Sequence, residues 1–313
     1  MGIGVSVTMR RVVALLGGLL AAVPVLAQRS LSGPERCGTG VPASEQRAYV
    51  GLPSGNVFCQ LVADPKAMRS FLSYLIEDKS TSVDSIENVG SVGISDAFGL
   101  VRWGANARDD GVQLNLEGAI FAQFDLGSSS YDLINADYLV ALPLTIRRGP
   151  VSTRLRVYHQ SSHLGDELLL RRGESLEREN ISFESADFIL SIDVAALRLY
   201  GGGEYIFNRA PKDLQHYIAH GGAEFRPAAE LLRWGRIGFL RFIAGADLKA
   251  SQQHDYDPSV SVRAGFEINR PFSGELPARS WSILFESYRG PSPYGQFFRQ
   301  KIQYIGVGAH FAL

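Results

Sequence analysis

Residues 112–126 alternate between apolar and mostly polar positions, and this run constrains the fold more than any other feature of the sequence. One parity holds Val112, Leu114, Leu116, Gly118, Ile120, Ala122, Phe124 and Leu126, and the other holds Gln113, Asn115, Glu117, Ala119, Phe121, Gln123 and Asp125. A two-residue period places the two sets on opposite faces of a β-strand. Strands of soluble proteins usually stop after about 5–6 residues, whereas a tilted strand that crosses a bilayer needs about 9–11. The run therefore predicts a membrane-crossing strand.

Similar runs recur up to the last residue, and their charged side chains keep to one parity, as in Arg198 with Glu204 and Arg263 with Glu267. A polar face repeated on long strands is typical of the lumen of a membrane barrel. The predicted strands lie near residues 70–77, 90–102, 112–126, 131–146, 151–160, 181–190, 195–208, 214–226, 237–249, 258–270, 279–289 and 301–313. They predict an all-β fold, a single antiparallel transmembrane β-barrel of about twelve strands at 70–313. Ten strands is the alternative count, because the first run is weak.

The composition agrees with a barrel and excludes two other classes. The chain is 45% hydrophobic, its mean hydropathy is close to zero and its formal net charge is −1. A helical membrane protein would be far more apolar, whereas alternating strands average out to such values. A near-neutral chain offers no basic face for nucleic acid, so nucleic acid is not an expected partner.

The first residues predict export. Arg10 and Arg11 precede an apolar stretch at 12–26, and Val25-Leu26-Ala27 is an acceptable small-residue cleavage site before Gln28. The stretch is shorter than the roughly 20 residues of a spanning helix. We therefore predict a signal peptide at 1–27 and, together with the barrel, location in the outer membrane of a Gram-negative cell.

Residues 28–69 show no sustained period and predict a short irregular N-terminal segment in the periplasm. The chain has only two cysteines, Cys37 and Cys59, and both fall in this segment. Because the periplasm is oxidising, we expect them to form a disulfide.

An even strand count places both termini in the periplasm. It makes the longest connection, 161–180, extracellular. Ile305, Val307, Ala309, Phe311 and Leu313 alternate up to the terminus. Outer-membrane barrels tend to end on such a strand, so the barrel-assembly machinery is an expected partner.

One segment contains residue types that can carry chemistry. In the sequence from Tyr158 to Glu167, His159 and Ser161 continue the lipid-facing parity of the strand before them. Residues two apart on a strand lie on one face, roughly 6.5–7 Å apart, so an imidazole can meet a hydroxyl. A serine needs such a base to become nucleophilic, and the base needs a third group to fix its tautomer. We expect that group on the next strand, at Glu179 by parity or else at Asn180.

Other readings of the same segment remain open. His159 and Ser161 can equally form a polar cluster that braces a long loop at the rim. Asp166 and Glu167 are adjacent carboxylates that could bind Ca²⁺, a cation that prefers oxygen ligands, or they are solvated loop charges.

The run from His159 to Ser162 resembles the His-x-Ser motif of outer membrane phospholipase A and of the lipid A 3-O-deacylase. In both families a His/Ser pair lies on the lipid-facing wall, and an Asn or a Glu on the next strand completes the site. This sequence departs from both families, because Ser162 stands where an Asn normally follows the serine. More of the chain, including Leu61 to Lys66 and Tyr158 to Glu167, resembles an uncharacterised Gram-negative outer-membrane family known only as a domain of unknown function.

Two functions follow as hypotheses. The resemblance implies an acyl-ester hydrolase acting on outer-membrane lipid, either phospholipid or lipopolysaccharide. The charged lumen parity, with the rim cluster taken as structural, implies a non-catalytic structural barrel or a narrow pore.

Overall fold

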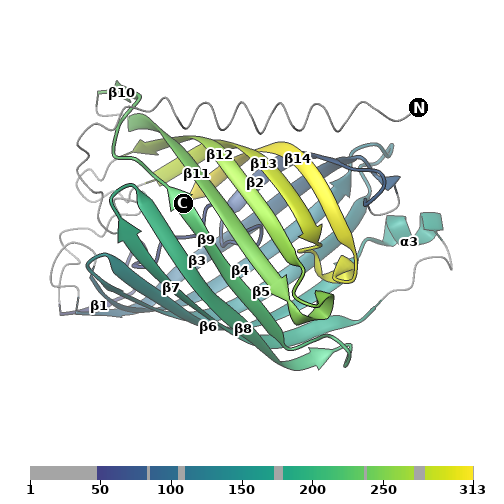
Figure 1. Ribbon diagram of the computed structural model, residues 1–313, viewed down its shortest axis with the longest axis horizontal. Helices are drawn as coiled ribbons and strands as arrows, with labels where there is room; N and C mark the ends of the chain where they lie inside the picture. The colour runs from purple at the N-terminus through teal and green to yellow at the C-terminus, as the bar shows by residue number, and fades with distance from the viewer. Residues whose placement is uncertain are drawn as a thin grey trace.

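A computed structural model describes residues 48–82, 85–104, 110–172, 179–235, 238–270 and 279–312. Its strands form a closed antiparallel barrel (Figure 1). Twelve strands make the closed wall: β2 (Ser70–Glu77), β3 (Asn88–Trp103), β4 (Gly111–Asp125), β5 (Leu133–Arg148), β6 (Val151–Leu164), β7 (Ile181–Val194), β8 (Leu197–Ala210), β9 (Tyr217–Phe225), β11 (Gly238–Ser251), β12 (Pro258–Arg270), β13 (Arg279–Pro291) and β14 (Lys301–Ala312). Each strand pairs with the next in the wall, and β14 pairs with β2 to close it.

The predicted twelve strands and the all-β fold are confirmed. Each observed strand lies within four residues of its predicted bounds at both ends. Two short strands are additional: β1 (Tyr49–Gly51) pairs with β3, and β10 (Leu232–Trp234) pairs with β11. The strands could be predicted because every strand has one face toward lipid and one face toward a charged lumen, which imposes the same two-residue period on each.

The two faces of the wall differ as the alternation predicts. Leu155, Val157 and Phe188 are almost half exposed on the outside. The charged side chains of the other parity are buried in the lumen, among them Arg154, Arg156, Arg198, Glu224, Arg241, Asp247, Arg263 and Glu267. They neutralise one another there: Glu267, for example, pairs with both Arg226 and Arg241.

Most of residues 52–69, which we call the luminal segment, lie inside the barrel. β1 and β2 pair with the same edge of β3, at its opposite ends, and the chain between them turns into the lumen. Val57, Leu61, Val62 and Ala63 are almost fully buried there. The prediction of a periplasmic segment at residues 28–69 is therefore wrong for the luminal segment, which lies in the lumen.

Arginines of the wall hold the luminal segment by its backbone. The guanidinium groups of Arg102, Arg147 and Arg198 each donate a hydrogen bond of 2.9 Å, to the carbonyl oxygens of Ser54, Val57 and Cys59 respectively. Arg263 donates to the carbonyl oxygens of Val62 and Asp64. Such contacts satisfy the buried peptide groups of a segment that belongs to no strand. They leave no periodic pattern in the sequence, which is why the segment was misplaced.

Cys59 lies in the luminal segment, is buried and is engaged in a disulfide. Cys37, its expected partner, and the signal peptide at 1–27 lie outside the described residues, so both expectations stay predictions.

The connection between β6 and β7 marks one end of the barrel. It begins with a short helix, α3 (Asp166–Arg172), and lies at the opposite end from β1 (Figure 1). We call this the α3 end. The connections at 211–216, 252–257 and 292–300 lie at the same end. Within the ranges described above, no helix is long and apolar enough to cross a membrane.

Candidate functional site on the outer wall

Three polar side chains follow one another on the outer face of β6 as it approaches the α3 end. His159, Ser161 and His163 are outward-facing, whereas Gln160 and Ser162 are buried toward the lumen. The His159 side chain is 47% exposed. The predicted face of His159 and Ser161 is therefore the observed one.

His159 is held by a carboxylate on the neighbouring strand. Its Nδ1 lies 2.8 Å from Oε1 of Glu184, the residue directly opposite it on β7. The other carboxylate oxygen, Oε2, accepts a hydrogen bond of 2.6 Å from Nδ2 of Asn208 on β8. A hydrogen-bonded chain thus runs across three strands on the outer wall.

A β-bulge brings Asn208 into this chain. The pairing of β7 with β8 shifts between Glu184 and Ser185, which oppose Asn208 and Ile206, so Phe207 is the extra residue. Without the shift, Asn208 would share the inward parity of Arg198 and Glu204, because it lies an even number of residues from both. Bulges commonly redirect a side chain in this way. The bulge gives Glu184 a second partner that alternation alone cannot reveal.

Ser161 lies one outward position beyond His159 and is partly buried opposite Ser182. Within the described residues, no hydrogen bond joins its hydroxyl to the imidazole, and Nε2 of His159 has no hydrogen-bond partner. Catalytic contacts are often loose before substrate binds. Since Glu184 occupies Nδ1, Nε2 is the nitrogen available to a serine or a substrate.

His163 is a second imidazole beside Ser161, but its surroundings differ. Its ring packs edge-on against Tyr138 on β5, with 5.8 Å between the ring centroids. His159 has the carboxylate of Glu184 to fix its tautomer, as a general base requires.

Glu179 and Asn180, the residues expected to orient the base, lie elsewhere. The Glu179 carboxylate accepts a hydrogen bond of 3.0 Å from Nε of Arg299, which also binds Asp213 at 2.7 Å. These bonds raise the pKa of Arg299 and lower the pKa of Asp213. Arg299 therefore ties three loops together at the α3 end through Glu179 and Asp213, and Asn180 is exposed beside Glu179.

Glu179 shares its parity with Ile181 and Phe183, and the prediction of Glu179 as the orienting group required these two apolar residues to face lipid. Both are instead buried in the lumen, in an apolar cluster with Phe121, Leu139 and Tyr158. Near the α3 end, apolar side chains line the lumen as well as the outer wall. The outward residues of β7 there are therefore Ser182 and Glu184.

Asp166 and Glu167 form the exposed first turn of α3. Carboxylates at a helix N-terminus are stabilised by the helix dipole without any ion. Among the residues that the structure describes, no three His, Cys, Asp or Glu side chains gather as metal ligands would.

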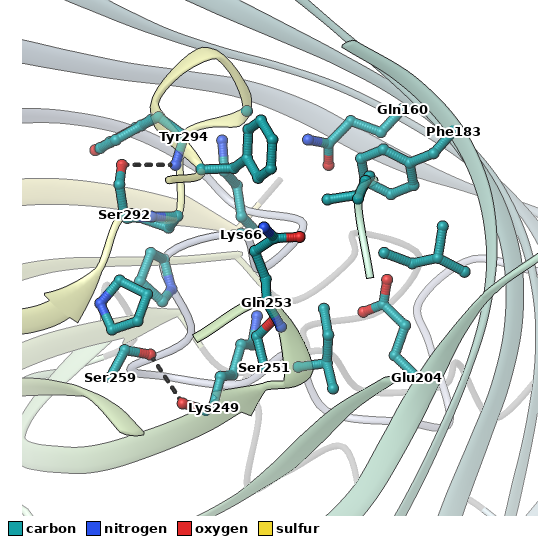
Figure 2. Close-up of a pocket in the computed structure, with 18 of the residues that line it drawn as sticks. Lys66, Gln160, Phe183, Glu204, Lys249, Ser251, Gln253, Ser259, Ser292 and Tyr294 are labelled. Atoms are coloured by element: carbon teal, nitrogen blue, oxygen red, sulfur yellow. Dashed lines mark hydrogen bonds between the residues drawn. The ribbon is translucent and has the colours of Figure 1, made fainter. Parts of the chain in front are cut away.

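A pocket of about 170 Å³ lies inside the barrel at the α3 end, behind the wall that carries His159 (Figure 2). Lys66 of the luminal segment projects into it, and Gln160 and Phe183 line one side. The three basic residues Lys66, Arg156 and Lys249 in its lining each pair with an acidic one: Asp137, Asp187 and Asp64 respectively. The lysine and arginine side chains of the pocket are thus paired with carboxylates, whereas the outer site has an available imidazole nitrogen.

Three solved structures share this fold. The outer membrane phospholipase dimer of Salmonella typhi, solved with bound calcium, superposes with a TM-score of 0.50 and 13% identity, covering 78% of this chain and 90% of that one. Outer membrane phospholipase A of Escherichia coli gives 0.50 and 12%, covering 80% and 93%. An active-site asparagine-to-alanine mutant of the latter gives 0.50 and 13%, covering 82% and 93%. At these identities the likeness establishes the barrel fold of an outer-membrane protein and nothing finer.

No curated protein matches the sequence. A family described as protein of unknown function, DUF1207, matches residues 24–313.

Proposed function

Because this chain belongs to the DUF1207 family, described only as a protein of unknown function, we propose its function from the site itself: an outer-membrane acyl-ester hydrolase acting on membrane lipid. The observation that carries the proposal is the hydrogen bond between His159 and Glu184, beside Ser161 on the outer wall. A base oriented by a carboxylate and placed next to a serine is the arrangement that activates a hydroxyl.

The mechanism assigns one role to each group. Ser161 Oγ attacks the ester carbonyl while Nε2 of His159 takes its proton, and the imidazolium then protonates the departing alcohol. Water, deprotonated by the same nitrogen, releases the fatty acid from the acyl-serine. Glu184 keeps the Nδ1 proton in place and stabilises the positive charge on the ring. Asn208 holds Glu184 in that orientation.

The position of the site supports a lipid substrate. His159 and Ser161 lie on the same outer face as Leu155 and Val157, which a membrane barrel turns toward lipid. A water-soluble ester would have to cross the lipid layer to reach them, whereas a membrane lipid is already beside them. Phospholipid and lipopolysaccharide both present acyl esters at this surface. The solved barrels of the same fold are named phospholipases, which favours phospholipid as the first substrate to test.

The test compares purified wild type with Ser161→Ala in detergent micelles, on phospholipid and on lipid A. Released fatty acid is followed by mass spectrometry, with added Ca²⁺ and with chelator, because Asp166 and Glu167 are the carboxylates expected to bind Ca²⁺. We expect release by the wild type and a loss of several orders of magnitude in the variant. If the wild type releases nothing, or if Ser161→Ala equals it, the rim cluster is structural.

The C-terminal strand suggests a partner during biogenesis. β14 places Ile305, Val307 and Phe311 on its outer face. We expect the barrel-assembly machinery to recognise this strand. Exchange of Phe311 for Asp should lower the amount of barrel recovered from outer membranes without changing synthesis.

A further inference from the structure

A single buried carboxylate joins the luminal segment to the strand that carries Ser161. Asp137 on β5 is fully buried and faces the lumen. It accepts hydrogen bonds from Nζ of Lys66 and from Oγ of Ser162. The backbone N–H of Gly295, in the loop between β13 and β14, donates to it at 3.2 Å. Three parts of the chain that are remote in sequence thus meet at one side chain.

We call the contacts of Asp137 with Lys66, Ser162 and Gly295 the junction. Lys66 is enclosed there. Its Nζ lies 4.6 Å from the ring centroid of Phe121 and 4.8 Å from that of Tyr294. Burial lowers the pKa of Lys66, and the neighbouring Asp137 opposes that shift. A cation held between two aromatic faces and a carboxylate has little freedom to move. Figure 2 shows Lys66 and Tyr294 side by side in the pocket.

The junction fixes β6 from the inside at the level where Ser161 faces outward. Ser162 lies directly opposite Asp137 in the strand pairing. Its carbonyl oxygen accepts a hydrogen bond of 2.6 Å from Nε2 of Gln296, which also donates to the carbonyl oxygen of Glu179. β6 ends two residues later, at Leu164, where a long connection begins. Strand ends beside long loops are among the least stable parts of a fold.

We propose that Lys66 and Asp137 are positioning residues for Ser161, so that the outer site is assembled only while the luminal segment is seated. The inference rests on the proposed hydrolase function. Ser161 and Ser162 are consecutive, so a shift of Ser162 on the inner face moves Ser161 on the outer face. A displacement of about 1 Å at a reacting group can cost about 10²-fold in rate.

The experiment compares Lys66→Met with wild type in two measurements. The first is amide hydrogen exchange at residues 158–164, which needs no activity. The second is kcat and KM for release of fatty acid from phospholipid in mixed micelles. We expect exchange at Ser161 and Ser162 to rise about tenfold, and kcat to fall about tenfold with KM unchanged within about twofold. Lys66→Arg should recover most of both.

Two further variants separate positioning from general loosening. Lys301→Met removes the exposed ion pair between Lys301 and Asp257 at the α3 end, and neither residue belongs to the luminal segment or to β6. It should leave both measurements as in the wild type. Lys66→Met leaves the buried Asp137 carboxylate without its cation, and the double variant Lys66→Met/Asp137→Asn removes that charge. We expect the kcat of the double variant to stay low. Recovery of kcat in the double variant would overturn the proposal.

The remaining outcomes are also decisive. Unchanged exchange in Lys66→Met overturns the proposal, and so does faster exchange with an unchanged kcat. If the wild type releases no fatty acid, the proposed function fails, and the exchange measurement still decides whether the luminal segment holds this end of β6.

Discussion

His159 on β6 and Glu184 on β7 face each other directly across the strand pair, with 2.8 Å between Nδ1 and Oε1. Replacing Glu184 with Gln keeps a side chain of the same size but removes the negative charge that stabilises the imidazolium. We expect kcat on ester lipid to fall about 10²–10⁴-fold. Glu179→Gln, which changes only the loop contact with Arg299, is the matched control and should retain wild-type kcat. Equal losses in the two variants would contradict the role of Glu184.

Asn208 should contribute through Glu184 alone. Asn208→Ala removes the donor to Oε2 and leaves His159 bound to Oε1. Since a hydrogen bond to a charged group is worth about 1.5–3 kcal/mol, we expect kcat to fall about tenfold with KM unchanged. Asn180→Ala is the control, because Asn180 is exposed and, within the part of the chain that the structure describes, makes no hydrogen bond to His159, Glu184 or Asn208. A raised KM with normal kcat would assign Asn208 to substrate binding instead.

The luminal charges should matter for stability rather than for catalysis. Glu267 lies between Arg226 and Arg241, 3.3 Å from Nη1 of Arg226 and 2.5 Å from Nη2 of Arg241, and all three side chains are almost fully buried. Glu267→Gln removes the buried negative charge that these two guanidinium groups share, so we expect the free energy of unfolding to fall by about 3–5 kcal/mol. Urea unfolding in lipid vesicles, followed by tryptophan fluorescence, measures it. Asp257→Asn, which breaks an exposed pair with Lys301, should show no measurable change.

The filled lumen predicts that the wild-type barrel does not conduct. The luminal segment and the paired charges occupy the interior that a pore would need. In planar bilayers we expect no current steps above baseline, with an open porin in the same chamber as the positive control. Reproducible steps would contradict an occluded lumen and would favour the narrow pore over the hydrolase.

Alternation was enough to predict the wall, because each strand meets the same two environments along its whole length. It was also enough to place His159 and Ser161 on one face. Alternation did not predict that Glu184 faces outward, because Ile181 and Phe183 are apolar and yet face the lumen. It did not predict the outward position of Asn208 either, because a bulge at Phe207 reverses the parity. A one-residue bulge changes the face of the strand on which a side chain lies, but it does not change the composition of the sequence.

The luminal segment was beyond prediction for a different reason. Its burial depends on partners that are distant in sequence, such as Arg198 for Cys59 and Lys249 for Asp64. The Gly, Pro and Ser content of the N-terminal region is equally typical of a solvent-exposed linker. Only the closed wall, with arginines already directed inward, turns such a stretch into an interior element.

The arginine contacts to carbonyl oxygens have a consequence for how this chain can vary. Arg102, Arg147, Arg198 and Arg263 bind peptide groups, which every amino acid supplies. An exchange of one small side chain for another between Ser54 and Val62 leaves those bonds in place. Inserting or deleting a single residue moves the following carbonyls by up to about 3.3 Å, beyond the reach of a hydrogen bond. The luminal segment therefore tolerates substitutions between small side chains in this stretch but not a change in its length.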